Sequence, residues 1–265
     1  MHRIISRILI CLPPVLLIGG CLSMGGGLSV ASPRANSDSY QLLEQTTRSV
    51  SGCQYRYRVY QPDTPSTSTS VVLGHGFLRD QDNMIGLSRA MANRGIPVVT
   101  LDFCNMRPWN GHHQRNARDM RDLARALKIA DDIVYGGFSA GALAAVLASD
   151  ENTRAILALD MVDQADQGQK AIQKLPIPLL GLAGPPSSCN ANSNGDALFT
   201  ARDEGSFSQL DRIPGASHCD FESPSNWLCE VACGNKDNFG SEKSRRTTII
   251  NQSVESLLPH LGTPG

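Results

Sequence analysis

The sequence GGFSAGA, residues 136–142, places a serine in the pattern G-x-S-x-G between two apolar runs. The run before it, 132–138, has the composition of a buried strand, and the run after it, 140–150, that of a buried helix. A chain that passes directly from strand to helix must turn sharply, and side chains at the two motif glycines would collide with the neighbouring strand and helix. The pattern therefore predicts a tight turn that pushes the Ser139 hydroxyl out above the edge of a sheet.

Short apolar strands alternate with helical patterns along the rest of the chain. We expect strands at 53–62, 71–74, 96–103, 132–138, 154–160 and 177–184, and a strand or turn within 208–217. We expect helices at 82–95, 113–128, 140–150 and 247–261. This alternation predicts the α/β class: a doubly wound, mostly parallel sheet with helices on both faces. With 265 residues, 41% of them hydrophobic, and no internal repeat, a single domain is the simplest organisation.

The N-terminus has the pattern of an export signal. A short basic head is followed by an apolar run that two prolines interrupt, so we expect residues 1–20 to be a signal peptide. The run ends in LLIGGC, which is typical of bacterial lipoproteins and predicts a lipid on Cys21. Residues 21–39 are rich in Gly and Ser and form the expected tether, which leaves 40–265 as the domain. The alternative is an ordinary signal peptide, cut near Ala31, and a soluble periplasmic or secreted protein.

Six cysteines remain after removal of the signal peptide and lipidation of Cys21. They are Cys53, Cys104, Cys189, Cys219, Cys229 and Cys233. An even number in an oxidising compartment predicts up to three disulfides, with fifteen possible pairings. Cys229 and Cys233 have no second close pair or nearby histidine pair that would complete a zinc site.

The charge pattern limits the partners. A formal net charge of -1 gives no electrostatic footprint for nucleic acid. We expect no metal and no organic cofactor, a small or polymeric substrate, membrane contact through the N-terminal lipid, and a monomeric protein.

A serine nucleophile needs a base and an acid, which follow it in the order acid, histidine in this kind of sheet. His218, in PGASHCDF after the last expected strand, is the predicted base. His112 and His113 precede the serine, and His260 falls in the C-terminal helix. For the acid, Asp160 at the end of strand 154–160 is the first choice. Asp163 is the second and Asp196 the third.

The stretch LGHGF, residues 73–77, follows the first core strand. A loop in this place provides the second oxyanion donor, and the helix that follows the serine provides the first. The predicted donors are the backbone N–H groups of Phe77 and Ala140. We expect His75 to pack this loop rather than to take part in chemistry.

Five motifs in order, HGF, NRGIPVVTLDF, GFSAG, LDMVD and GASHCDF, resemble the α/β-hydrolase superfamily over about residues 54–260. More narrowly, they resemble its chlorophyllase-like and cutinase-like (polyester-hydrolase) branches. LDMVD is similar to the chlorophyllase stretch L-D-P-V-D, which implies Asp160 as the acid. Phe138 and Ala140, however, replace the His and Arg of the chlorophyllase motif G-H-S-R-G.

The polyester-hydrolase resemblance implies its acid after the next strand, where this chain has none before Asp196. It also implies a disulfide between that loop and the region of the histidine. Cys189 with Cys219 is the implied pair, with Cys229 or Cys233 as a replacement for Cys219.

These observations predict an exported serine hydrolase of carboxylic esters that acts through Ser139, His218 and Asp160 and an acyl-enzyme. The alternatives are a non-catalytic envelope lipoprotein on the same scaffold, or a peptidase or thioesterase with the same triad. Four side chains are candidates for an acyl pocket: Met84, Trp109, Met161 and Trp227.

Overall fold

The computed structural model describes residues 38–49, 52–104, 112–173, 175–202, 206–234 and 242–264. The predicted signal peptide, Cys21 and nearly all of the predicted tether lie outside the described residues. Residues 33–265 belong to one compact unit. Within the described residues, no helix has the length and apolar character needed to cross a membrane.

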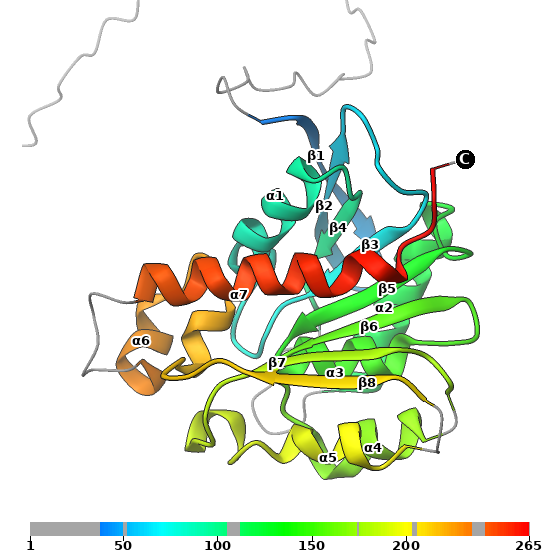
Figure 1. The fold of residues 1–265 in the computed structure, drawn as a ribbon. Coiled ribbons are helices and arrows are strands. Elements are labelled where there is room, and N and C mark those ends of the chain that lie inside the picture. Colours follow the sequence, from blue (N-terminus) through cyan, green and yellow to red (C-terminus); the bar gives the residue numbers. More distant parts are fainter. Residues whose placement is uncertain are drawn as a thin grey trace, which may run out of the picture. The chain divides into compact units, whose positions relative to one another are not determined.

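Eight strands of the described chain form one sheet (Figure 1). In chain order they are β1 Tyr40–Arg48, β2 Gln54–Pro62, β3 Ser70–Gly74, β4 Val98–Leu101, β5 Ile133–Phe138, β6 Thr153–Leu159, β7 Leu179–Ala183 and β8 Ser208–Arg212. In the sheet they follow the order β1-β2-β4-β3-β5-β6-β7-β8. β1 and β2 are antiparallel to their neighbours, and β4 to β8 run parallel with β3. The expected mostly parallel sheet is confirmed.

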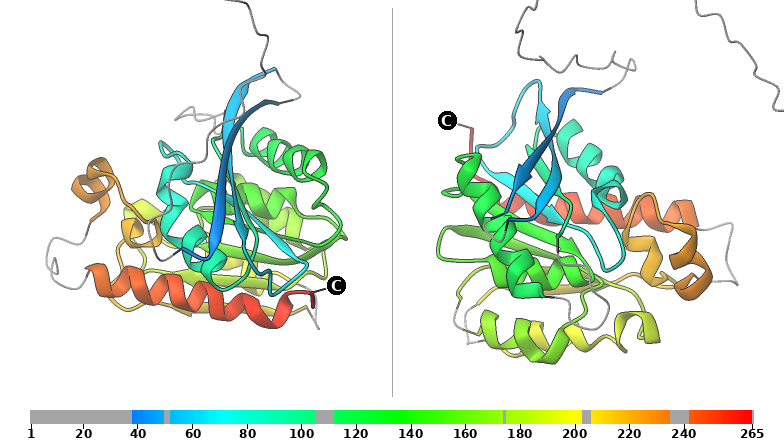
Figure 2. Two further views of the ribbon diagram at one scale, coloured as in Figure 1. Left: turned by 90° about the horizontal axis from the view of Figure 1, so that it is seen from above. Right: turned by 180° about the vertical axis from the view of Figure 1, so that it is seen from behind.

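The helices cover both faces of this sheet (Figure 2). They are α1 Ile85–Asn93, α2 His113–Ala126, α3 Ala140–Ala148, α4 Gln167–Ile172, α5 Ala197–Thr200, α6 Trp227–Cys233 and α7 Glu242–Leu257. α1 and α7 pack on one face, and α2 to α5 contribute to the apolar cluster on the other.

Strand β5 shows why both faces need covering. Its side chains alternate, so that Val134 and Phe138 face the α1 and α7 side while Ile133 and Tyr135 face the α2 and α3 side. All four are 2% exposed or less. The central strands therefore appear in the sequence as continuous apolar runs.

The sequence missed several elements. β1 carries mostly exposed side chains and pairs with β2 at the edge of the sheet that the described residues form, so it has no buried apolar run. α4, α5 and α6 are seven residues long or shorter, and they lie in stretches for which the sequence predicts no helix. α7 begins at Glu242 instead of 247, and Ile249, Val254 and Leu257 form its buried stripe.

Candidate active site

Ser139 stands at the turn between β5 and α3 with φ 54° and ψ −116°. Its N–H donates to Leu159 O on the neighbouring strand at 2.9 Å. A Cβ on Gly137 would lie 2.6 Å from Gly74 O, and one on Gly141 would lie 2.3 Å from the same atom. The end of β3 thus presses on this turn, as the glycine pattern predicts, and forces Ser139 into a backbone conformation that side chains rarely adopt.

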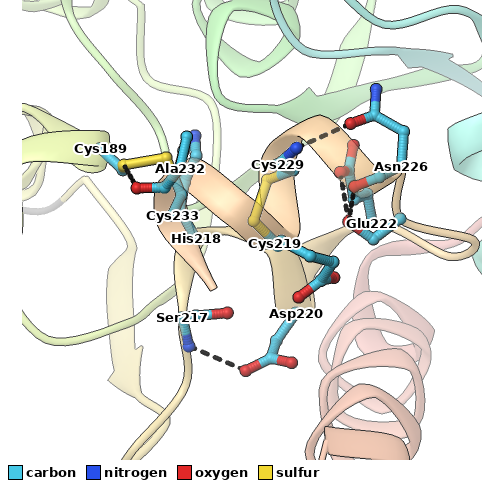
Figure 3. Close-up of a disulfide and its surroundings, with 12 residues drawn as sticks. Cys189, Ser217, His218, Cys219, Asp220, Glu222, Asn226, Cys229, Ala232 and Cys233 are labelled. Carbon is cyan, nitrogen blue, oxygen red and sulfur yellow. Dashed lines mark hydrogen bonds between the residues drawn. A yellow bond between two sulfur atoms is a disulfide. The ribbon is translucent and has the colours of Figure 1, made fainter. Parts of the chain in front are cut away.

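His218 opens the short helical turn His218–Phe221, which follows β8. Ser217 and Asp220 form a capping box there, with Ser217 N donating to an Asp220 carboxylate oxygen at 2.8 Å (Figure 3). The His218 ring packs against Phe138 with ring centroids 4.6 Å apart. Its Nε2 lies 3.2 Å from Ser139 Oγ. The histidine is 9% exposed, so the contact is largely shielded from water.

Asp160 directly follows β6 and is 2% exposed. Its Oδ2 lies 2.6 Å from His218 Nδ1. Its Oδ1 accepts from Gly184 N at 3.0 Å and from Asn190 Nδ2 at 3.2 Å. A carboxylate held in this way keeps the proton on His218 Nδ1, so that Nε2 can accept the Ser139 proton.

The other two candidate acids have different partners. Asp163 accepts from the backbone N–H groups of Gly168 at 2.8 Å and Gln169 at 3.0 Å, at the start of α4. Asp196 forms an ion pair with Arg212. Neither has a contact with His218 among the hydrogen bonds and ion pairs of the described residues. The structure therefore brings Ser139, His218 and Asp160 together in a line. Asp163 and Asp196 contact other groups.

Asn190 is a site residue that sequence reasoning missed. Besides Asp160 Oδ1, its Nδ2 donates to Pro185 O at 3.0 Å, and its Oδ1 accepts from Ser187 N at 2.8 Å and Ser193 N at 3.1 Å. This buried amide fixes both the loop after β7 and the orientation of the carboxylate. The sequence signal is weak, because the loop SSCNANSNG contains three asparagines.

A cavity of about 510 Å³ opens beside Ser139 and His218. Its lining is mostly apolar and consists of Phe77, Leu78, Arg79, His113, Phe138, Ser139, Ala140, Val162, Gln164, Cys189, His218, Leu228, Cys229, Ala232 and Cys233. The two predicted oxyanion residues, Phe77 and Ala140, both belong to this lining.

Three of the four side chains expected to form an acyl pocket, Met84, Met161 and Trp227, are not part of this lining. Met84 and Met161 are buried in the core, and Trp227 is 75% exposed. Trp109 lies outside the described residues.

The remaining histidines have separate surroundings. His75 Nδ1 lies 2.8 Å from Gly76 O, and its Nε2 accepts from Phe103 N at 2.9 Å, so it holds its loop as predicted. Burial lowers the pKa of His75. His113 lines the cavity, and burial lowers its pKa as well. The His260 ring packs against Phe207 in a tilted arrangement, with ring centroids 5.3 Å apart.

A buried ion pair joins the two loops that flank the cavity. Arg79 Nε lies 2.7 Å from Glu222 Oε2, and both side chains are less than a tenth exposed. Burial raises the pKa of the Glu222 carboxyl, and the Arg79 guanidinium opposes that rise. Arg79 Nη1 also lies 3.4 Å from Phe77 O within its own loop. The ion pair with Glu222 thus connects this loop to the segment that follows His218.

The described part of the chain contains three disulfides: Cys53–Cys104, Cys189–Cys233 and Cys219–Cys229. The implied pair Cys189–Cys219 is wrong, and the stated replacement of Cys219 by Cys233 is what the structure shows. The reason lies in α6, which was not foreseen. The helix carries Cys229 and Cys233 one turn apart, so that Cys229 meets the His218 turn while Cys233 reaches the loop of Cys189 (Figure 3).

Among the described residues, no group of three or more His, Cys, Asp and Glu side chains is arranged to hold a metal ion.

No family model matches the chain, and no curated protein matches it. Solved structures do. An α/β serine hydrolase homologue from Coxiella burnetii is 16% identical, with a TM-score of 0.61 over 81% of this chain and 97% of its own. A dienelactone hydrolase from Anabaena variabilis is 18% identical, with a TM-score of 0.62 over 84% and 99%. An esterase domain from Rhodothermus marinus is 14% identical, with a TM-score of 0.56 over 80% and 98%. The chain has the α/β-hydrolase fold.

Proposed function

We propose that the protein is a serine hydrolase that cleaves carboxylic esters through an acyl-enzyme. The observation that carries this proposal is the chain of contacts from Ser139 Oγ through His218 to Asp160, at 3.2 Å and 2.6 Å. Its position beside an open, mostly apolar cavity favours an apolar ester. The solved esterases and hydrolases with the same fold support the proposal by analogy.

In the first half of the reaction, His218 Nε2 takes the Ser139 proton while Ser139 Oγ forms a bond to the ester carbonyl carbon. The carbonyl oxygen gains the negative charge, and the backbone N–H groups of Phe77 and Ala140 are the proposed donors to it. His218 then gives its proton to the alcohol oxygen as the C–O bond breaks. Asp160 compensates the charge on the imidazolium throughout.

In the second half, water takes the place of the alcohol. His218 accepts a proton from the water as its oxygen attacks the acyl carbon, and returns the proton to Ser139 Oγ as the carboxylic acid leaves. The position of the acid after β6 supports the chlorophyllase-like resemblance over the polyester-hydrolase one. We therefore include a chlorophyllase-like relationship in the proposal.

The test is hydrolysis of p-nitrophenyl butyrate by a form of the protein that begins at Pro33, the start of the compact unit, made under oxidising conditions. Ser139→Ala should lower kcat by at least about 10³-fold, because a triad acts as a unit. Ser149→Ala is the matched control. Ser149 follows the same helix α3, and its hydroxyl donates to Ala145 O at 2.9 Å, away from His218 and Asp160, so activity should remain.

Covalent trapping separates catalysis from mere binding. A fluorophosphonate should add to Ser139 in the wild-type protein and to nothing in Ser139→Ala, as read by peptide mass spectrometry. A folded wild-type protein that neither turns over the ester nor reacts with the probe would overturn the proposal. It would favour the non-catalytic lipoprotein.

We also propose that the protein is exported and carries a lipid on Cys21. Three disulfides are typical of proteins that fold in an oxidising compartment, which supports export. Expression of the full chain with radiolabelled palmitate should label the wild-type protein and leave Cys21→Ser unlabelled. Equal labelling, or none in the wild type, would overturn the lipid assignment.

A further inference from the structure

Leu78 has a backbone conformation that side chains rarely adopt. Its φ is 56°, which brings the Cβ of a leucine too close to the backbone. The side chain is 50% exposed, so its burial does little to offset this cost. Leu78 directly follows Phe77, whose backbone N–H is a proposed oxyanion donor. A strained residue beside a site persists only where the surrounding structure holds it in place.

The guanidinium of Arg79 contacts the peptide carbonyls on both sides of Leu78. Arg79 Nη1 donates to Phe77 O and to Leu78 O, each at 3.4 Å. A charged donor favours the arrangement in which both carbonyls point toward it. If Leu78 changed to an ordinary negative φ, the two peptide groups would rotate relative to each other, and at least one of these contacts would break.

Glu222 fixes this guanidinium from another segment of the chain. Arg79 Nε donates to Glu222 Oε2 at 2.7 Å, and the glutamate side chain is 0% exposed. Ser225 Oγ donates to the other carboxylate oxygen at 2.8 Å. Glu222 directly follows the helical turn of His218 (Figure 3). The arginine therefore stays where it is, because moving it away would leave a buried carboxylate without its counter-charge.

We propose that the ion pair between Arg79 and Glu222 holds Leu78 in its left-handed conformation. The pair thereby positions the N–H of Phe77 as an oxyanion donor. Arg79 and Glu222 are then positioning residues, which act through the backbone of the loop. Because Glu222 belongs to the segment of His218, the pair also fixes the oxyanion loop relative to the base. The oxyanion role rests on the proposed function, whereas the hold on Leu78 does not.

Arg79→Gln together with Glu222→Gln tests the oxyanion role in the full chain, made under oxidising conditions. This double substitution, which we call the pair variant, leaves no buried charge unpaired. We expect kcat on p-nitrophenyl butyrate to fall about tenfold or more and KM to change less, because a displaced donor acts on the developing oxyanion. The affinity for a trifluoromethyl ketone, whose adduct with Ser139 carries the same negative oxygen, should fall by a similar factor.

The matched control is Arg58→Gln with Asp82→Asn. The Arg58 side chain is 13% exposed and forms an ion pair with Asp82, and neither residue belongs to the cavity lining that the described residues form. This control should lose stability and keep its kcat. An unchanged kcat in the pair variant, or an equal loss in the control, would overturn the oxyanion role.

Glycine and alanine at position 78 test how the pair acts. Both substitutions remove the leucine side chain, but only glycine adopts a positive φ without a steric cost. Added to the pair variant, Leu78→Gly should give a kcat several-fold higher than Leu78→Ala. Equal kcat values would show that the pair does not act through Leu78, and the inference would be wrong.

Unfolding in urea tests the hold on Leu78 without any turnover. With the ion pair intact, the midpoint of Leu78→Gly should exceed that of Leu78→Ala, because the native loop imposes the positive φ. In the pair variant the difference should shrink, because the loop can relax. A difference of the same size in both backgrounds would overturn the hold on Leu78. A wild-type protein that neither cleaves the ester nor binds the ketone would instead refute the proposed function, and the urea midpoints would still decide whether the pair holds the loop.

Discussion

Ser139 and His218 are neighbours in space, but the chain holds them by different means. The nucleophile turn, residues 136–142, is held by strand register and by glycines on which the backbone of Gly74 presses. The base segment, residues 218–234, is held by two disulfides and by ion pairs of its carboxylates with arginines. Close backbone packing needs particular residues at particular places, whereas crosslinks fix a segment that has no strand of its own. The site therefore joins a rigid sheet edge to a fastened surface segment.

Asp160 lies in neither region, but it orients His218 toward Ser139, so its substitution has the largest expected effect. Asp160→Asn should lower kcat about 10⁴-fold, because the amide no longer selects the His218 tautomer that accepts from Ser139. Asp163→Asn and Asp196→Asn should keep their activity, since those carboxylates bind the start of α4 and Arg212. Steady-state kinetics on p-nitrophenyl butyrate measures all three. An equal loss in either control would assign the acid role elsewhere.

The disulfides test whether the base segment depends on its crosslinks. Replacing both cysteines of a pair by serine should cost about 3 kcal/mol for Cys219–Cys229 and about 4 kcal/mol for Cys53–Cys104, from the loop lengths that they close. Their sequence separations are 10 and 51. Only the first pair adjoins His218, so only its loss should also lower kcat.

Urea unfolding measures these stabilities, and kinetics at a temperature where both variants are folded measures kcat. If kcat falls more in the Cys53–Cys104 variant than in the Cys219–Cys229 variant, the idea that crosslinks position the base segment is wrong.

The same substitution at two glycines compares the regions directly. Gly141→Ala in the nucleophile turn should cost about 3 kcal/mol, because the new Cβ meets backbone atoms that cannot move aside. The nearest is Gly74 O at 2.3 Å. Gly215→Ala, just before the base segment, should cost only about 1 kcal/mol, because its φ of +68° is strained but the space is open. Similar unfolding free energies for the two variants would contradict the idea that backbone packing holds the turn.

The smallest effect is a pH dependence on the side of the nucleophile turn. Asp119 on α2 has no hydrogen-bond partner for its Oδ2 within the described residues, whereas Asp220, Glu222 and Glu230 of the base segment each form an ion pair with an arginine. Burial, with a contribution from Asp122, raises the pKa of Asp119 from 3.8 to about 6. The folded state then holds this proton more tightly than the unfolded chain. Its contribution to stability is present below pH 3.8 and is lost as the pH rises through about 6.

Asp119→Asn removes this loss. Relative to the wild type, the variant should gain stability between pH 4 and pH 7, with no further gain above. Urea midpoints at several pH values measure the difference, and a constant difference across that range would show that Asp119 does not titrate in this way.

The sequence predicted the parts that depend on local backbone constraints. The glycines around Ser139 and the apolar runs of the central strands follow from packing that each residue experiences with its near neighbours, so the turn and the parallel sheet could be foreseen. The position of Asp160 was the first of three choices, and the structure places it against His218.

The parts that sequence reasoning missed depend on contacts between distant segments. The pairing of Cys189 with Cys233 follows from a short helix, α6, that packing rather than propensity stabilises. Asn190 supports Asp160 across 30 residues of sequence, and nothing local distinguishes it from the two asparagines beside it. β1 escaped detection because an edge strand with exposed side chains lacks an apolar run.

The backbone of Ser139 also has a consequence for engineering. Its φ of 54° costs a serine about 1 kcal/mol that glycine would not lose. The residue proposed to do the chemistry thus sits where another residue would make the protein more stable. A selection that rewards thermal tolerance and ignores turnover would replace Ser139 with glycine and record an improvement, so any library built on this scaffold has to be screened for activity at every round.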